Sequence, residues 1–201
     1  MGKASHNKAI RAQHTAAEAK DNKHEKPAKP WWREALELVL LAAALALAFK
    51  FFLFDTRNIP SSSMVPTIVP GDRVIMSRLS YLGAKDPERG DIVVFRAPDE
   101  LNERDDLIKR VVGLPGEEVA VSGGYVYING EALDEPYLAE TPMYEFGPYT
   151  VPENCYFVLG DNRNWSNDAH MWQEHYISGD SIKGKAVWRY WPLSRFGAIY
   201  E

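Results

Sequence analysis

The part of the chain beyond Phe54 consists of short runs of Val, Ile and aromatic residues that Gly and Pro interrupt. Such runs are typical of β-strands, and no long helical period occurs here. Asn129-Gly130 stands between two of the runs and predicts a two-residue hairpin, because both central residues of that turn need a positive φ. The expected strands are Arg73–Ser77, Asp91–Phe95, Leu107–Gly113, Glu118–Ser122, Tyr125–Ile128, Tyr156–Gly160 and Ile182–Trp188. The sequence therefore predicts a mostly β domain over residues 55–201, either a barrel or a pair of sheets.

An apolar segment precedes this domain. Leu38 to Phe49 is an unbroken run of 12 apolar residues, and the 20 residues from Ala35 to Phe54 contain only two charged side chains, Glu37 and Lys50. About 12 residues alone are too few to cross a bilayer, but about 20 are enough. Both charges lie near an end, where long side chains can reach the headgroups. We therefore expect one transmembrane helix over residues 31–54.

The charge differs on the two sides of this segment. Residues 1–33 carry eight Lys/Arg against three Asp/Glu, whereas residues 55–201 carry 14 against 23. Positive residues favour the cytoplasmic side of a membrane. We expect a disordered basic tail over residues 1–30 in the cytoplasm, a single pass through the plasma (inner) membrane and an extracytoplasmic domain. A signal peptide cleaved after Ala46-Leu47-Ala48, an organelle transit peptide and a buried core helix are the alternatives.

The composition also limits the chemistry of the domain. Cys155 is the only cysteine, so neither an internal disulfide framework nor a Cys-based metal cage is possible. The sequence has no His-Glu-x-x-His or other metal-ligand spacing. Its net charge of −5 argues weakly against a general nucleic-acid binder. We therefore expect a protein that uses no metal or cofactor and binds no nucleic acid.

Three consecutive serines lie between Pro60 and Pro66, just beyond the apolar segment. Proline restricts its own backbone and that of the preceding residue, so these serines are expected on a stiff loop. A serine in such a loop could act as a nucleophile. Most Ser-rich segments are only linkers, however, and the loop alone does not decide between a linker and a nucleophile.

A serine nucleophile needs a base that takes its proton. Three of the five histidines lie in the N-terminal tail, and His170 and His175 are most simply interpreted as surface side chains. Lys109 lies within an expected buried strand, where desolvation would keep its amine uncharged. Strand alternation leaves open that Lys109 faces solvent. The polar loop Gly160–Asp168 could hold such a lysine in place or could be purely structural.

Four sequence boxes in this order resemble the type I signal peptidases, the membrane-bound Ser–Lys endopeptidases of the S26 kind. The boxes are Ser63-Met-Val-Pro-Thr67, Gly71-Asp-Arg-Val74, Arg89-Gly-Asp-Ile-Val93 leading into Lys109-Arg-Val-Val-Gly113, and Gly160-Asp-Asn-Arg163. The resemblance covers about residues 31–192. It implies a signal-peptidase-like β catalytic domain that carries one N-terminal transmembrane helix. It also implies a serine endopeptidase that removes signal peptides from exported preproteins.

The resemblance assigns roles to individual residues. Ser63 would be the nucleophile and Lys109 the general base. Ser61 would donate its hydroxyl to the oxyanion beside the backbone N–H of Ser63, and Ser166 would bond to the Lys109 amine and orient it. The residues expected to line a shallow apolar substrate pocket are Ile59, Met64, Ile68, Leu107 and Ile108, and the expected structural supports are Arg110, Asp161 and Asp168. The implied substrate is the extended end of a signal peptide, paired at a sheet edge and cut after an Ala-x-Ala type sequence. We expect a monomer that contacts preproteins and the lipid bilayer.

The chain departs from the family pattern in two places. The usual Asp-Asn-Ser is Asn164-Trp165-Ser166 here, and the usual Ser-Arg is Ala169-His170, so Asp168 could pair only with His170. The family's variable β extension corresponds to residues 117–149, which we expect to form little more than a ribbon. Two alternatives to a general signal peptidase are a Ser–Lys protease for one dedicated substrate or an organelle, and an anchored β-domain without activity.

Overall fold

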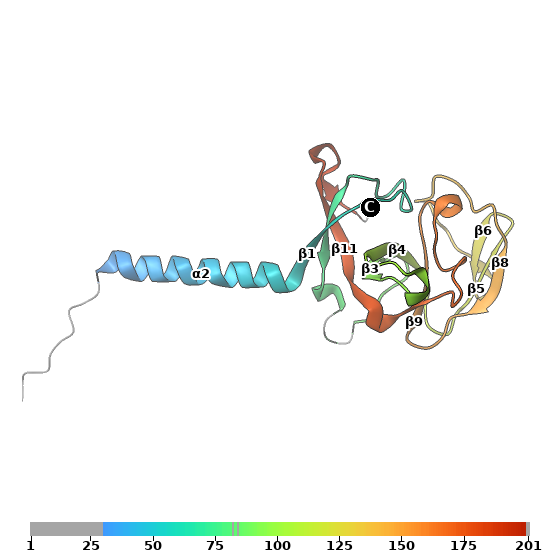
Figure 1. Ribbon diagram of the computed structural model, residues 1–201, viewed down its shortest axis with the longest axis horizontal. Coiled ribbons are helices and arrows are strands. Elements are labelled where there is room, and N and C mark those ends of the chain that lie inside the picture. Colours follow the sequence, from blue (N-terminus) through green and yellow to red (C-terminus); the bar gives the residue numbers. More distant parts are fainter. Residues whose placement is uncertain (1–29, 82, 84, 200–201) are drawn as a thin grey trace, which may run out of the picture. The chain divides into compact units, whose positions relative to one another are not determined.

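The computed structural model describes residues 30–81, 83 and 85–199 (Figure 1). The expected basic tail, apart from its last residue, lies outside the described residues. The chain divides into two compact units, the first ending at Ala46 and the second beginning at Leu47. The second unit contains every strand and every residue of the expected site.

One long helix, α2, extends from Trp31 to Leu53. Most of its residues are Ala, Leu and other good helix formers, and its first turn begins with a hydrogen bond from Arg33 N to Pro30 O. The sequence predicts a transmembrane helix over residues 31–54, and the observed helix ends one residue earlier. Within the part of the chain that the structure describes, no helix is long and apolar enough to span a membrane.

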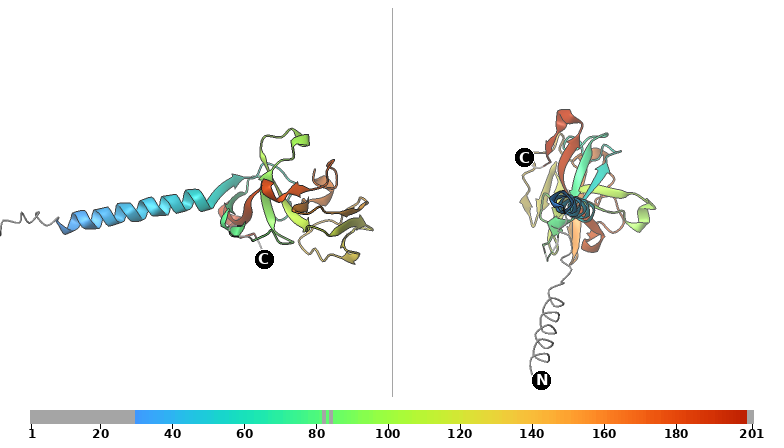
Figure 2. Two further views of the ribbon diagram at one scale, coloured as in Figure 1. Left: turned by 90° about the horizontal axis from the view of Figure 1, so that it is seen from below. Right: turned by 90° about the vertical axis from the view of Figure 1, so that its left-hand side faces the viewer.

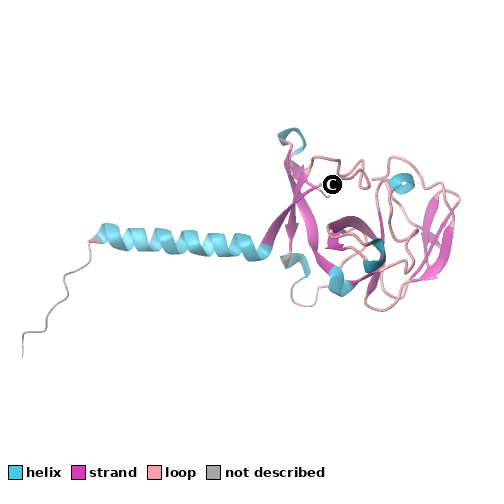
Figure 3. Ribbon diagram, in the orientation of Figure 1, coloured by secondary structure: helices cyan, strands magenta, loops and turns pink. Residues whose placement is uncertain are grey.

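The larger sheet has eight strands in the order β1-β2-β11-β3-β4-β9-β10, with β12 pairing beside β11. Its strands are β1 (Phe54–Asn58), β2 (Arg73–Ser77), β3 (Ile92–Arg96), β4 (Asp106–Gly113), β9 (Cys155–Leu159), β10 (Ile177–Ser178), β11 (Ile182–Trp191) and β12 (Gly197–Ala198). All of its pairings are antiparallel. The connections between these strands contain short 3₁₀ turns and no further α-helix within the described residues, which confirms the mostly β prediction (Figure 3).

The expected ribbon over residues 117–149 is a four-stranded antiparallel sheet, so the sequence interpretation underestimated it. Its order is β7-β6-β5-β8, with β5 (Glu118–Ser122), β6 (Tyr125–Ile128), β7 (Glu131–Ala132) and β8 (Phe146–Thr150). The hairpin at Asn129-Gly130 has φ of 52° and 83°, as its sequence predicts. We call these four strands the inserted sheet. It lies at the end of the second unit opposite β1 and β11 (Figures 1 and 2).

Two hydrophobic clusters hold the second unit together. The larger includes Phe95 and Phe157 of the main sheet together with Val119 and Val126 of the inserted sheet, so both sheets share this core. The smaller cluster consists of Ile59, Met64, Ile68, Val74, Met76, Ile92, Val94, Ile108, Ala186 and Ile199. It fixes the serine-containing loop against β2, β3 and β4.

The strands that the sequence does not predict include β1 and β8, which lie at edges of their sheets. β1 reads Phe-Asp-Thr-Arg-Asn and β8 reads Phe-Gly-Pro-Tyr-Thr. Polar residues, glycine and proline are tolerated at a sheet edge, where one side of the strand needs no partner. Local composition therefore does not predict either strand.

Candidate active site

Ser63 lies in the loop that connects β1 to β2. The loop closes on itself, because Gly71 N donates to Ile59 O over 2.9 Å. Met64, directly after Ser63, is fully buried and its carbonyl accepts a hydrogen bond from Ile68 N over 2.9 Å. The apolar neighbours of Ser63 thus anchor the loop in the smaller core, and Ser63 itself retains 8% of its surface exposed.

Lys109 lies in the middle of β4, opposite Val93 of β3. From Ile108 to Gly113 every residue of this strand is buried, so side chains on both faces are covered. Lys109 is 4% exposed, which excludes the interpretation that it faces solvent. Desolvation lowers its pKa below the ordinary value, although Asp168, Glu103 and Asp161 act in the opposite direction.

The two side chains meet directly. Lys109 Nζ lies 2.7 Å from Ser63 Oγ and donates a hydrogen bond to it. Once the amine is neutral, its lone pair can accept the hydroxyl proton over the same short distance. A nucleophile and a base in hydrogen-bond contact within a buried site can carry out covalent acyl transfer.

Ser61 and Ser166 differ in how closely they match their expected roles. Ser61 Oγ lies 3.3 Å from Ser63 Oγ, within hydrogen-bond distance of the expected nucleophile. Ser166 is 4% exposed, but its Oγ makes no hydrogen bond to any residue that the structure describes. The expected bond from Ser166 to Lys109 is therefore not formed, and the Lys109 amine donates to Ser63.

Gly160 brings the last box against the nucleophile loop. A Cβ atom at this position would lie 2.2 Å from Ser166 Oγ and 2.4 Å from Ser63 O. Only glycine allows this approach. The next residues complete the contact, because Asn162 N donates to Ser63 O over 3.0 Å.

The three expected support residues are all buried and paired. Arg110 forms two parallel hydrogen bonds with Asp161, over 2.8 and 2.7 Å. Asp168 accepts a hydrogen bond from Gly160 N over 2.8 Å and lies 2.6 Å from His170 Nδ1. The sequence predicts the contact with His170, but Asp168 also holds the backbone of the box, so His170 is not its only partner.

The five expected pocket residues do not form one group. Four of them, Ile59, Met64, Ile68 and Ile108, belong to the smaller core cluster. Leu107 instead packs against the larger cluster. Successive side chains of a strand point to opposite faces, so neighbours such as Leu107 and Ile108 cannot share one wall.

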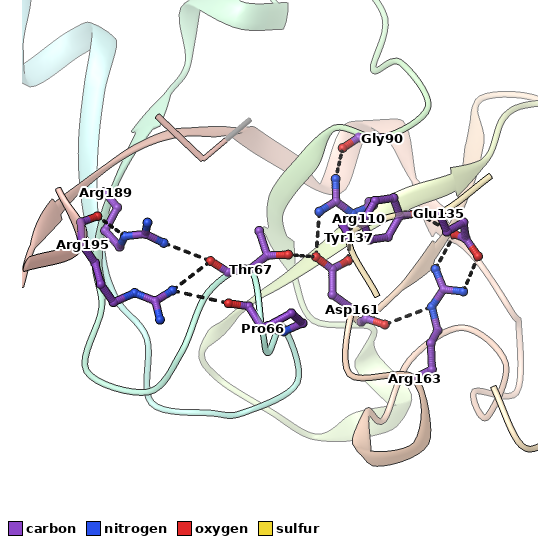
Figure 4. Close-up of polar contacts among 11 residues, drawn as sticks. Pro66, Thr67, Gly90, Arg110, Glu135, Tyr137, Asp161, Arg163, Arg189 and Arg195 are labelled. Atoms are coloured by element: carbon purple, nitrogen blue, oxygen red, sulfur yellow. Dashed lines mark hydrogen bonds and ion pairs between the residues drawn. The ribbon is translucent and has the colours of Figure 1, made fainter. Parts of the chain in front are cut away.

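The structure adds residues that the sequence analysis does not single out (Figure 4). Thr67 Oγ1 donates to Asp161 over 2.5 Å, and the Tyr137 ring lies under the Arg110 guanidinium at 3.8 Å. Arg163 forms a buried ion pair with Glu135. Thr67 and Arg163 lie in boxes that the sequence marks. Glu135 and Tyr137 lie outside the boxes and reach the site through long-range contacts that no local pattern predicts.

Comparison with known proteins identifies similar sequences. The family model described as signal peptidase, peptidase S26, matches residues 32–191. A Synechocystis protein named probable signal peptidase I-2 is 46% identical over 182 residues, which cover 89% of this chain and 82% of that protein. Signal peptidase I of Leptolyngbya laminosa is 43% identical over 171 residues, covering 83% of each chain. Probable thylakoidal processing peptidase 2, chloroplastic, of Arabidopsis thaliana is 41% identical over 171 residues, covering 83% of this chain and 46% of that protein.

The buried amine predicts how stability depends on pH. Because the pKa of Lys109 is lower in the folded state, the unfolded chain binds more protons between the two pKa values. Stability therefore rises with pH across that window, and at lower pH the fold carries the full cost of a buried charge. We expect Lys109→Met to unfold at a higher urea concentration than the wild type at low pH, with a gain that shrinks as pH approaches the unfolded pKa.

Urea unfolding at about pH 5 and about pH 10 measures this difference. Lys85→Met, which removes an exposed lysine, is the control and should change little at either pH. A Lys109→Met variant that is no more stable than the wild type at the lower pH would contradict the interpretation of the site.

Proposed function

We propose, from the premise that this chain belongs to the signal peptidase family S26, that Ser63 is its nucleophile and Lys109 its general base. The chain is a serine endopeptidase that removes signal peptides from preproteins. The observation that carries the assignment is the 2.7 Å distance between Lys109 Nζ and Ser63 Oγ, together with the burial of Lys109, which is 4% exposed. A binding module would have no use for an amine with a lowered pKa beside a hydroxyl.

The reaction proceeds in two halves. Ser63 Oγ attacks the scissile carbonyl while Lys109 Nζ takes its proton, and the resulting ammonium then protonates the departing amine of the mature protein. This leaves the signal peptide as an ester on Ser63. Water that gives a proton to Lys109 attacks the ester, and the ammonium returns that proton to Ser63 Oγ as the signal peptide is released with a new carboxyl group. Each half uses only side chains of this chain and water.

Two hydroxyl groups assist in this proposal. Ser61 would donate to the oxyanion together with the backbone N–H of Ser63, and its position 3.3 Å from the nucleophile supports that role. Ser166 would orient the lysine after Ser63 has become acylated. Its buried hydroxyl then gains a partner that it lacks among the described residues.

Substrate recognition follows from the shape of the smaller core. Met64 and Ile68 are fully buried and Ile108 keeps 9% of its surface exposed, so this core offers a substrate side chain only a small apolar surface. We propose that an Ala-x-Ala type sequence is cut for this reason. The enzyme would act as a monomer on the extended end of the signal peptide.

Cleavage of a model preprotein in detergent by the full chain tests the catalytic assignment. Ser63→Ala and Lys109→Ala should each lower kcat by at least about 10³-fold, because neither group of the pair acts alone. Ser61→Ala should lower kcat by about 10²-fold, the usual effect of one lost oxyanion donor. Ser194→Ala and Lys85→Ala, which change exposed residues of the same types, are the controls and should retain the wild-type rate. Activity that survives in Ser63→Ala and Lys109→Ala would contradict the mechanism.

The relatives support membrane association of this protein. The finer proposal is a single-pass anchor over Trp31–Phe54 in the plasma (inner) membrane, with the N-terminus in the cytoplasm and the catalytic domain outside. Apolar side chains of α2 such as Leu38 and Val39 are exposed by 67% and 64%, a surface that suits lipid. The opposite charges of residues 1–33 and 55–201 support the orientation.

Alkaline extraction of membranes from cells that express the full chain tests the anchor. The wild type should remain in the membrane fraction, whereas Leu40→Asp/Leu41→Asp should be released, since each central Asp costs about 2.5–3.5 kcal/mol of insertion free energy. Leu193→Asp, at an exposed position of the catalytic unit, is the control and should stay with the membrane. Release of the wild type would contradict the anchor.

A further inference from the structure

The connection between β7 and β8 of the inserted sheet carries Glu135 and Tyr137. These side chains point toward the larger sheet, which carries Lys109 (Figure 4). Tyr137 OH donates to Glu135 Oε1 over 2.5 Å. Glu135 also contacts Arg163, and the Tyr137 ring contacts Arg110 of the larger sheet (Figure 4). The pair therefore links the inserted sheet to the active site at two points.

The first point is Arg163, in the loop that follows β9. Its guanidinium donates to both carboxylate oxygens of Glu135, over 2.7 and 2.6 Å, and its Nε donates to Gly160 O over 3.2 Å. The Arg163 side chain is 0% exposed and that of Glu135 is 6% exposed. A charge so deeply buried is destabilised severely when its partner is removed. Glu135 consequently fixes where the loop leaves β9.

The second point is Arg110, the residue after Lys109 in β4. The Tyr137 ring covers one face of its guanidinium at 3.8 Å, while Asp161 accepts hydrogen bonds from two of its N–H groups. Arg110 is thereby held in one orientation by an aromatic face and a carboxylate. The strand that carries the lysine and the loop that carries Asp161 are joined through this arginine.

The loop that follows β9 also contacts the loop that carries Ser63. Asp161 accepts a hydrogen bond from Thr67 Oγ1 over 2.5 Å, four residues beyond Ser63. Asn162 donates its backbone N–H to Ser63 O over 3.0 Å and its side-chain amide to Ser62 O over 3.1 Å. An unbroken series of contacts therefore runs from Glu135 and Tyr137 to the serine that the lysine must reach.

We propose that Glu135 and Tyr137 are positioning residues, which act through Arg163 and Arg110 to set the placement of Ser63 relative to Lys109. This inference rests on the proposed roles of Ser63 and Lys109. The inserted sheet then serves catalysis as well as the core. Displacing reacting groups by about 1 Å can cost about 10²-fold in rate, so loosening this pair should lower kcat. Substrate affinity should change little, because neither side chain belongs to the smaller core that would receive the substrate.

Steady-state kinetics of the full chain in detergent tests the proposal. We expect Glu135→Gln and Tyr137→Leu to lower kcat by about 10- to 100-fold with KM within about twofold of the wild type. Tyr137→Phe keeps the ring on Arg110 and loses only the hydroxyl bond, so its kcat should fall by less than about fivefold. Glu131→Gln and Tyr125→Phe change exposed residues of the same types on the same sheet and should leave kcat unchanged.

The pH dependence separates positioning from a loss of folded protein. Activity requires neutral Lys109, so the acid limb of the kcat/KM profile follows its pKa, which burial lowers. Loosened packing would admit water and move this limb to higher pH in Glu135→Gln and Tyr137→Leu. A smaller folded fraction would instead lower kcat/KM by the same factor at every pH and leave the acid limb in place. If Glu135→Gln does not fold, Glu135→Leu/Arg163→Met removes both buried charges and should fold with a lowered kcat.

The outcomes are distinct. Rates of Glu135→Gln and Tyr137→Leu near the wild-type rate would overturn the proposal, as would losses that follow the folded fraction with an unmoved acid limb. Ser63→Ala is measured in the same assay. If it is inactive while the positioning variants are fully active, this inference alone fails; if it remains active, the proposed function fails first.

Discussion

The contact between one lysine amine and one serine hydroxyl, both largely shielded from bulk water, is the constraint on which the rest of the structure depends. A lysine in water is charged at neutral pH and cannot accept a proton. β4 solves this by burying Lys109 on a strand covered on both faces, which lowers its pKa. The same burial carries a cost in stability, which the surrounding cores must offset.

The architecture around this contact converges on it from separate parts of the chain. The smaller core fixes the serine loop through Met64, and Gly160 allows the last box to approach within a distance that no larger residue permits. Buried ion pairs of Arg110 and Arg163 then hold that box in place. Buried pairs of this kind contribute little net stability compared with apolar packing. In the proposed mechanism, their role is to define one geometry for Ser63 and Lys109.

Much of this could be predicted from the sequence, and the exceptions have physical reasons. Short β-branched runs and Asn129-Gly130 predict strands and a hairpin because those signals are local. The edge strands β1 and β8 escape detection, since polar residues, Gly and Pro are allowed there. Ser63 and Lys109 follow from ordered motifs, whereas Glu135 and Tyr137 reach the site across the fold and leave no local pattern. Leu107 packs against the larger cluster, apart from the other four expected pocket residues, because successive side chains of a strand point to opposite faces.

The most direct test of the central claim is the titration of the Lys109 amine itself. Nuclear magnetic resonance of ¹⁵N-lysine-labelled protein, with the signal assigned by its absence in Lys109→Met, would follow that single group against pH. The account predicts a pKa clearly below the ordinary lysine value of 10.5. A pKa at or above that value would show a charged lysine at neutral pH and would contradict the account.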